Sequence, residues 1–156
     1  MANELSTAGI LVKYCVETTS GTRPTTGYTT IPNITDIPEF NPEPNNLEVT
    51  DLADTVWKRY IPGLKDPGGA ISLTANFTAA FKTAWEALVT AAGTGASATP
   101  AKKTWLEFMV PTIGSFYIAG TPAPLGFGGA AVDSVYQGSV YFTPNVIEGW
   151  GSSSTT

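Results

Sequence analysis

Apolar and polar side chains alternate with a period of two in several stretches of the chain, which is the pattern of half-buried β-strands. Residues 10–17 and 70–77 follow it most regularly. Their apolar faces consist of Val12, Tyr14 and Val16 in the first stretch and of Ile71, Leu73, Ala75 and Phe77 in the second. Residues 104–110 are apolar on most of both sides and predict a hairpin with residues 115–119. The patterns together predict a mainly β, antiparallel fold.

The remaining chain predicts weaker strands separated by turns. Residues 34–40 predict an edge or bulged strand, because Pro38 cannot donate to a ladder. Residues 47–50 predict a short strand. Residues 130–143 predict a long strand or a bent pair, with a bulge at Gly138 and an end at Pro144. A single domain over residues 1–156 would then begin with a polar arm (1–8) and end in a flexible, frayed tail (about 145–156).

One amphipathic helix is predicted at about residues 79–92. Thr78 is suited to be its N-cap, and Gly93 is placed to end it. Its apolar stripe consists of Phe81, Trp85, Leu88, Val89 and Ala92. A single helix among many strands is expected to cover one face of a sheet.

The connection at about residues 51–69 is far longer than the two to five residues of a tight hairpin. Its apolar content is unusual for a disordered loop, so we expect it to pack on a surface of the same chain or of a neighbour. Its acidic and basic residues are expected to meet across a subunit boundary and set the register of that contact. The residues expected at the contact are Asp51, Asp54, Trp57, Lys58, Arg59, Tyr60, Ile61, Leu64, Lys65 and Asp66.

Composition narrows the function. Charged residues make up 13% of the chain, about half the roughly 25% of average soluble domains. A surface with so few charges fits a subunit that assembles through much of its area, and it also fits a secreted β-domain. The net charge of −5 argues against binding nucleic acid through phosphate contacts. It is compatible with a wall past which nucleic acid slides.

Candidate chemistry is sparse. The chain has no His and one Cys, which excludes imidazole catalysis, His/Cys zinc sites and internal disulfides. Asp51 and Asp54 could form a metal or acid-catalytic site, but the calcium-loop spacing is absent and a charge cluster is the better interpretation. The beginning of the chain predicts no secretory signal, and no stretch predicts a membrane span. We therefore expect no cofactor, no metal, no membrane partner, and synthesis in the cytoplasm.

Residues 47–77 resemble the tail tube (major tail) proteins of long, non-contractile-tailed bacteriophages. The resemblance lies in the order of a strand, an acidic turn, an aromatic-basic segment, a glycine turn and a second strand. It extends to the helix after Phe77 and to the late strand ending at Thr143-Pro144. The quoted segments are Asp51-Leu52-Ala53-Asp54, Trp57-Lys58-Arg59-Tyr60, Ile61-Pro62-Gly63-Leu64-Lys65-Asp66 and Ile71-Ser72-Leu73-Thr74-Ala75-Asn76-Phe77.

The resemblance implies an antiparallel β-sandwich or half-barrel with a flanking helix. Copies would form hexameric rings that close into one β-barrel and stack into a tube, with the long connection reaching the adjacent ring. The implied partners are further copies, the tape measure protein, the tail tip or baseplate and the tail terminator. DNA would pass through the acidic lumen without specific binding. The protein would then be a non-enzymatic structural part of the virion tail, self-assembled in the host cytoplasm.

Two other functions fit the sequence less well. The first is a β-sandwich module that binds carbohydrate or a surface on a virion or cell, with Trp57, Trp105 or Trp150 exposed on a ligand face. The second is a carboxylate-dependent hydrolase using Asp51 and Asp54, although nothing else in the sequence converges on that pair.

Overall fold

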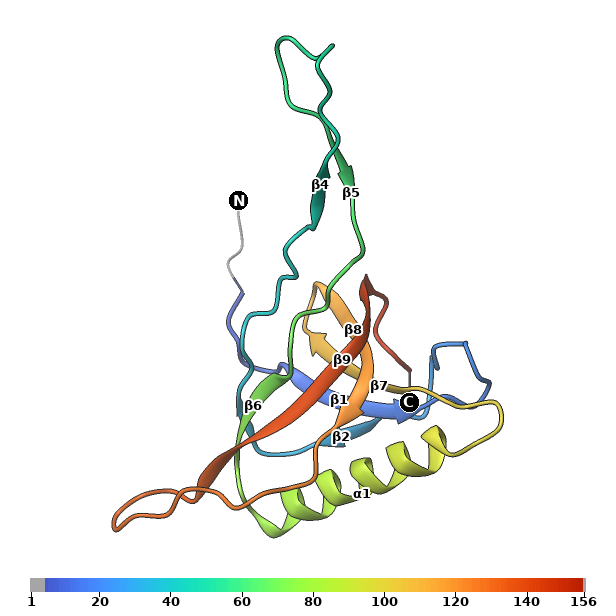
Figure 1. The fold of residues 1–156 in the computed structure, drawn as a ribbon. Coiled ribbons are helices and arrows are strands. Elements are labelled where there is room, and N and C mark those ends of the chain that lie inside the picture. Colours follow the sequence, from blue (N-terminus) through green and yellow to red (C-terminus); the bar gives the residue numbers. More distant parts are fainter. Residues whose placement is uncertain (1–4, 156) are drawn as a thin grey trace.

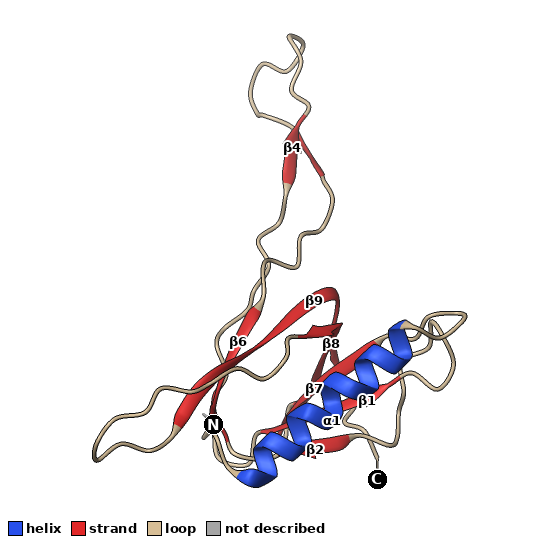
Figure 2. Ribbon diagram, turned by 60° about the horizontal axis from the view of Figure 1, so that its bottom comes forward, coloured by secondary structure: helices blue, strands red, loops and turns tan. Residues whose placement is uncertain are grey.

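The computed structural model describes residues 5–155 and contains one helix and two antiparallel sheets (Figures 1 and 2). The expected arm at residues 1–8 therefore lies partly outside the described residues. The elements are β1 (Leu11–Val16), β2 (Thr29–Ile31), β3 (Ile34–Asp36), β4 (Asn46–Glu48), β5 (Tyr60–Pro62), β6 (Ile71–Asn76), α1 (Ala79–Ala96), β7 (Thr104–Val110), β8 (Gly114–Pro122) and β9 (Gln137–Gly151). The mainly β fold with one helix is confirmed.

Seven strands form one curved sheet in the order β2-β1-β7-β8-β9-β6-β3. Its two edges, β2 and β3, are consecutive in the chain and are separated only by Pro32 and Asn33. Two residues span less than about 10 Å, so the sheet must curl until its edges lie close together. This gives the half-barrel that the resemblance to tail tube proteins implied. Asn33 adopts φ 64° at the crossing, where its carbonyl accepts a hydrogen bond from the backbone N–H of Asn76.

The main core lies between the sheet and α1. Figure 2 shows the helix lying across β1, β2 and β7. Thr78 caps it as predicted, accepting a hydrogen bond from the backbone N–H of Phe81. The Trp85 indole reaches past the core to donate to the carbonyl of Ala123 at 2.9 Å. The buried residues of this core are Val12, Ile31, Ile71, Leu73, Ala75, Phe81, Trp85, Leu88, Leu106, Phe108, Ile118, Val140 and Phe142.

The helix does not end at Gly93 but continues to Ala96, with Ser97 as its C-cap. The last turn is held from outside, because Lys102 donates its backbone N–H to the carbonyl of Gly95. A Cβ at Gly95 would come within 2.8 Å of Val16, so the small residue lets the helix end lie directly on β1. Tertiary packing therefore overrides the stop signal of a glycine.

The last strand differs most from the prediction. β9 begins at Gln137, not at residue 130, and runs through Pro144 to Gly151, so the residues expected to fray extend the sheet. Gly138 pairs regularly with Ala75 and is not a bulge. A Cβ there would come within 2.7 Å of the Phe77 ring, which explains the glycine. The register instead shifts twice against β8, near residues 145 and 148, and these irregularities let β9 bend.

Candidate interaction site on the projecting hairpin

Strands β4 and β5 form a two-stranded ribbon that projects far from the curved sheet (Figure 1). Asn46 pairs with Pro62, and Glu48 pairs with Tyr60. A backbone hydrogen bond from Gly63 to Asn45 continues the pairing toward the sheet. The predicted long connection is thus the tip of this hairpin and its returning arm, with β5 as its strand.

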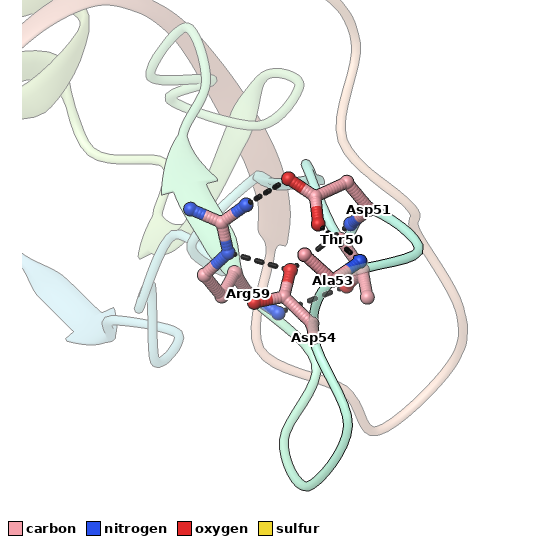
Figure 3. Close-up of polar contacts among 5 residues, drawn as sticks. All are labelled: Thr50, Asp51, Ala53, Asp54 and Arg59. Atoms are coloured by element: carbon pink, nitrogen blue, oxygen red, sulfur yellow. Dashed lines mark hydrogen bonds and ion pairs between the residues drawn. The ribbon is translucent and has the colours of Figure 1, made fainter.

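A compact ion-pair cluster organises the tip (Figure 3). The Arg59 guanidinium donates through Nε to Asp54 Oδ2 at 2.7 Å and through Nη2 to Asp51 Oδ2 at 2.9 Å. The same two carboxylates accept backbone N–H groups, from Ala53 to Asp51 and from Asp51 to Asp54. Thr50 Oγ1 accepts the backbone N–H of Arg59 at 2.9 Å. Five short contacts therefore fix a loop that has little core of its own.

This cluster joins the two predicted acidic residues to one of the predicted basic residues within a single chain. One guanidinium therefore binds both carboxylates at close range, so the pair lies in a charge cluster. Each exposed ion pair stabilises by about 0–1 kcal/mol, but the shared guanidinium and the backbone donors fix one loop conformation. Lys58 lies farther from its acidic neighbour, with Nζ 3.8 Å from Glu48 Oε1.

The apolar side chains of the hairpin point to solvent. Leu52 is fully exposed and Trp57 is 82% exposed. Large exposed apolar clusters on a single chain mark contact sites or aggregation hazards. In the described chain the hairpin does not pack on the sheet, so the expected partner surface is not found in cis. The exposed apolar residues of the hairpin are Leu47, Val49, Leu52, Val56, Trp57, Tyr60, Ile61 and Leu64.

A half-open groove of about 600 Å³ lies at the root of the hairpin. Its walls are the segment after β5 with Leu64, Lys65 and Asp66, the rising segment at residues 42–46, and residues 145–147 of β9. The predicted contact residues thus divide into two groups. The root group is Leu64, Lys65 and Asp66, and the tip group is Asp51, Asp54, Trp57, Lys58, Arg59, Tyr60 and Ile61. Their contact with another subunit stays a prediction.

Two buried carboxylates escaped the sequence analysis. Glu17 accepts the indole N–H of Trp105 and the backbone N–H groups of Lys103 and Gly21, each at 3.0 Å. Burial alone would raise the pKa of Glu17, but these donors outweigh it and hold the pKa below its usual range. Glu107 is fully buried on β7. Its signal was a single glutamate inside an otherwise apolar strand. Ser115 and Tyr117 on the next strand hydrogen-bond it, as does Ser154, 47 residues away.

Among residues 5–155, no group of three or more acidic, Cys or His side chains is arranged to hold a metal ion. No helix in the same range combines the length and apolar character needed to cross a membrane. Of the tryptophans suggested for a ligand face, Trp105 is buried, whereas Trp57 and Trp150 are exposed.

Comparison with solved structures finds the same fold over nearly the whole chain. One match is a chain of the cryo-EM structure of the anti-feeding prophage (AFP) baseplate, 6-fold symmetrised, with TM-score 0.61, 8% identity and coverage of 97% of this chain and 98% of that chain. Another is a chain from the tail of an empty GTA particle with C6 symmetry, with TM-score 0.60, 11% identity and coverage of 95% and 100%.

The two matched chains with this fold come from a baseplate and from a tail. No protein-family model matches the sequence, and neither does any curated protein. At 8% and 11% identity, the likeness concerns the fold and not particular site residues. A projecting hairpin that exposes its apolar side chains is the feature of this chain that most needs a partner.

Proposed function

We propose that this protein is a structural subunit of a phage tail tube, whose copies form hexameric rings that stack into a conduit for DNA. The apolar hairpin tip, which the β4–β5 ribbon carries away from the sheet and the Arg59 cluster orders, is the observation that carries the proposal. An isolated two-stranded ribbon is marginally stable in water, and exposure of Trp57 and Leu52 adds an unfavourable apolar surface. Both costs are removed if the tip inserts between neighbouring copies.

The fold supports the same proposal. Chains of similar length and fold occur in six-fold symmetric tail and baseplate particles. A hairpin at one end of the body gives a contact between unlike surfaces of successive copies, and contacts of this type generate rings or open stacks. The tip group would contact the adjacent ring, and the groove at the hairpin root would receive part of a neighbour. The tape measure, tail tip and terminator proteins would meet the ends or lumen of such a tube in the virion.

Charge fits the role of a conduit. A net charge of −5 for each subunit, multiplied around a ring, repels a DNA backbone and opposes sticking during passage. Passage of DNA through such a ring needs no specific base or phosphate contact.

Electron microscopy of the purified full chain over a range of protein concentrations tests the proposal. Rings or tubes with six-fold symmetry are expected at high concentration or after seeding with tail tip complexes. A chain that stays as small, uniform particles under both conditions would contradict it. Glycan binding that is lost in Trp57→Ala or Trp150→Ala would favour the surface-binding module instead.

A further inference from the structure

The last described residues, 152–155, lie on the sheet face opposite α1. Alternation along β7 places Leu106 and Phe108 in the main core and Trp105 and Glu107 on the other face. A second, smaller apolar cluster covers that face, formed by Trp105, Tyr117 and Ala119 with Tyr28 against it. Residues 152–155 leave β9 and cross this face. Thr155 donates its backbone N–H to the carbonyl of Thr25, so the segment bridges to the loop between β1 and β2.

Polar contacts hold this segment, and they converge on Glu107. The backbone N–H of Ser154 donates to Glu107 Oε1 at 2.9 Å, and the Ser154 hydroxyl donates to Oε2. The Ser115 hydroxyl, at 2.7 Å, and the Tyr117 hydroxyl, at 3.3 Å, complete the shell around Oε1. The single hydroxyl proton of Tyr117 is shared, because the carbonyl of Ser152 lies closer to Oη, at 2.6 Å, than Glu107 does. Ser115 Oγ also hydrogen-bonds Ser153 Oγ at 3.0 Å.

This arrangement has the properties of a peptide-binding site. The site side is built: Glu107, Ser115 and Tyr117 come from neighbouring strands and are fully buried. The bound segment contributes little to the core: Ser152, Ser153 and Thr155 are exposed, and the segment buries no apolar side chain. A segment held by hydrogen bonds to a rigid acceptor can leave without dismantling the core, although a fully buried carboxylate stripped of these donors is costly.

We propose that Glu107, Ser115 and Tyr117 form an acceptor site for an extended serine-bearing peptide segment. The chain's own residues 152–155 fill it in cis, and the same segment of a second copy fills it once the cis segment is displaced. Exchange of an identical element between copies is a low-cost route to association. The acceptor does not depend on the tip contact proposed above, because it lies on the sheet and uses none of the hairpin residues.

The surrounding charges favour an ionised acceptor. Lys13 is the β1 register partner of Glu107. On the β8 side, the Arg23 guanidinium stacks over the Tyr117 ring at 3.8 Å and is ion-paired with Glu148. Burial by itself would raise the pKa of Glu107, but hydrogen bonds from Ser115 and Ser154, with the charge of Lys13, hold it below its usual range. The carboxylate is therefore ionised at neutral pH and accepts from every donor.

A labelled peptide with the sequence of residues 151–156 tests the acceptor by fluorescence anisotropy on the full-length chain. Ser154→Pro removes the backbone N–H and the hydroxyl that both donate to Glu107, and so weakens the hold of the cis segment on the site without shortening the chain. This variant is expected to bind the peptide at least about tenfold more tightly than the wild-type chain, whose site is filled. The gain is expected to disappear when Glu107→Gln is added, and a peptide with proline at the Ser154 position should not bind.

Equal peptide affinity of the wild-type and Ser154→Pro chains would overturn the proposal, as would a gain that survives Glu107→Gln. Carboxypeptidase digestion of the full chain gives an independent readout if Ser154→Pro lowers the melting temperature. Ser154→Ala should accelerate release of the last residues about tenfold. Ser20→Ala removes a hydroxyl bond of 2.7 Å to Ala101 elsewhere and should leave that rate unchanged. Identical rates for Ser154→Ala and wild type would reject the acceptor.

Discussion

Replacement of Trp57 by alanine separates folding from assembly in this protein. Trp57 is 82% exposed at the tip of the hairpin, so its loss removes almost nothing from the packed core. Exposed substitutions away from caps and networks usually change the free energy of unfolding by about 0.5 kcal/mol or less. The isolated chain should therefore melt within about 1–2 °C of wild type.

Trp57→Ala is expected to weaken the assembly of copies into rings or tubes. A tryptophan buries about 150–250 Å² on full burial, and roughly four fifths of that area is still available at Trp57. At about 25 cal/mol per Å², burying roughly 160 Å² of it contributes about 4 kcal/mol for each contact. Tryptophans at interface centres typically cost about 2–4 kcal/mol on truncation, which agrees. The concentration needed for rings or tubes should rise by roughly two to three orders of magnitude.

Sedimentation and electron microscopy across a concentration series measure this shift, and calorimetry measures the melting temperature. Trp85→Ala is the matched control, because Trp85 is fully buried and donates to Ala123. It should destabilise the subunit by about 3–5 kcal/mol whether or not it assembles. The reasoning is refuted if Trp57→Ala assembles at the wild-type concentration, or if it lowers the melting temperature as much as Trp85→Ala does.

Three further substitutions test other parts of the structure. Glu107→Gln should flatten the pH dependence of the free energy of unfolding, which urea midpoints measured over an acid pH series report. A carboxylate whose pKa is lower in the folded state stabilises the fold fully above its unfolded-state pKa of about 4.3. That contribution is lost as the pH falls toward the lower pKa of the folded state. Gly138→Ala should destabilise the fold by about 1–3 kcal/mol, because the new Cβ would clash with the Phe77 ring. Gly93→Ala, at an open position on the helix surface, should be neutral or stabilise by up to about 1 kcal/mol. Equal urea midpoints for the two variants would contradict this expectation. Arg59→Met should change the melting temperature by only a few degrees, but it should make the tip more mobile, which faster amide exchange in residues 50–59 would report. Unchanged exchange would show that the ion pairs do not order the loop.

Period-two alternation identified the strands that bury one face, because burial itself imposes the pattern. Residues 71–76 alternate between buried and half-buried as the sequence predicted. β2 and β5 were not predicted, because each has only three residues and is bounded by turn residues, Pro32 after β2 and Pro62-Gly63 at the end of β5. β9 was misplaced because each shift in its register disrupts the alternation, and the ladder is already irregular beside Pro144.

For the candidate site, residue type was informative and pairing was not. The aromatic and aliphatic residues of the long connection predicted a surface in need of a partner, and the structure exposes them. That Arg59 binds both Asp51 and Asp54 could not be selected from sequence, because Lys58 and Lys65 offered the same charge. Glu107 stood out only as a single glutamate in an apolar strand. Its role could not be predicted, because its partner Ser154 lies 47 residues away in a segment with the composition of a frayed end.

The crossing from β2 to β3 makes completion of the sheet a single event. Two residues join the opposite edges, so both edges can pair only when the five strands between them are present and in register. A slip of one residue in any inner ladder would invert the side chains of a strand and pull the edges apart. Folding is then a closure with strongly non-local contacts, which are slow to form. Amide protection at Ile31 and Thr35 would appear together, and late, as the signature of a closed subunit.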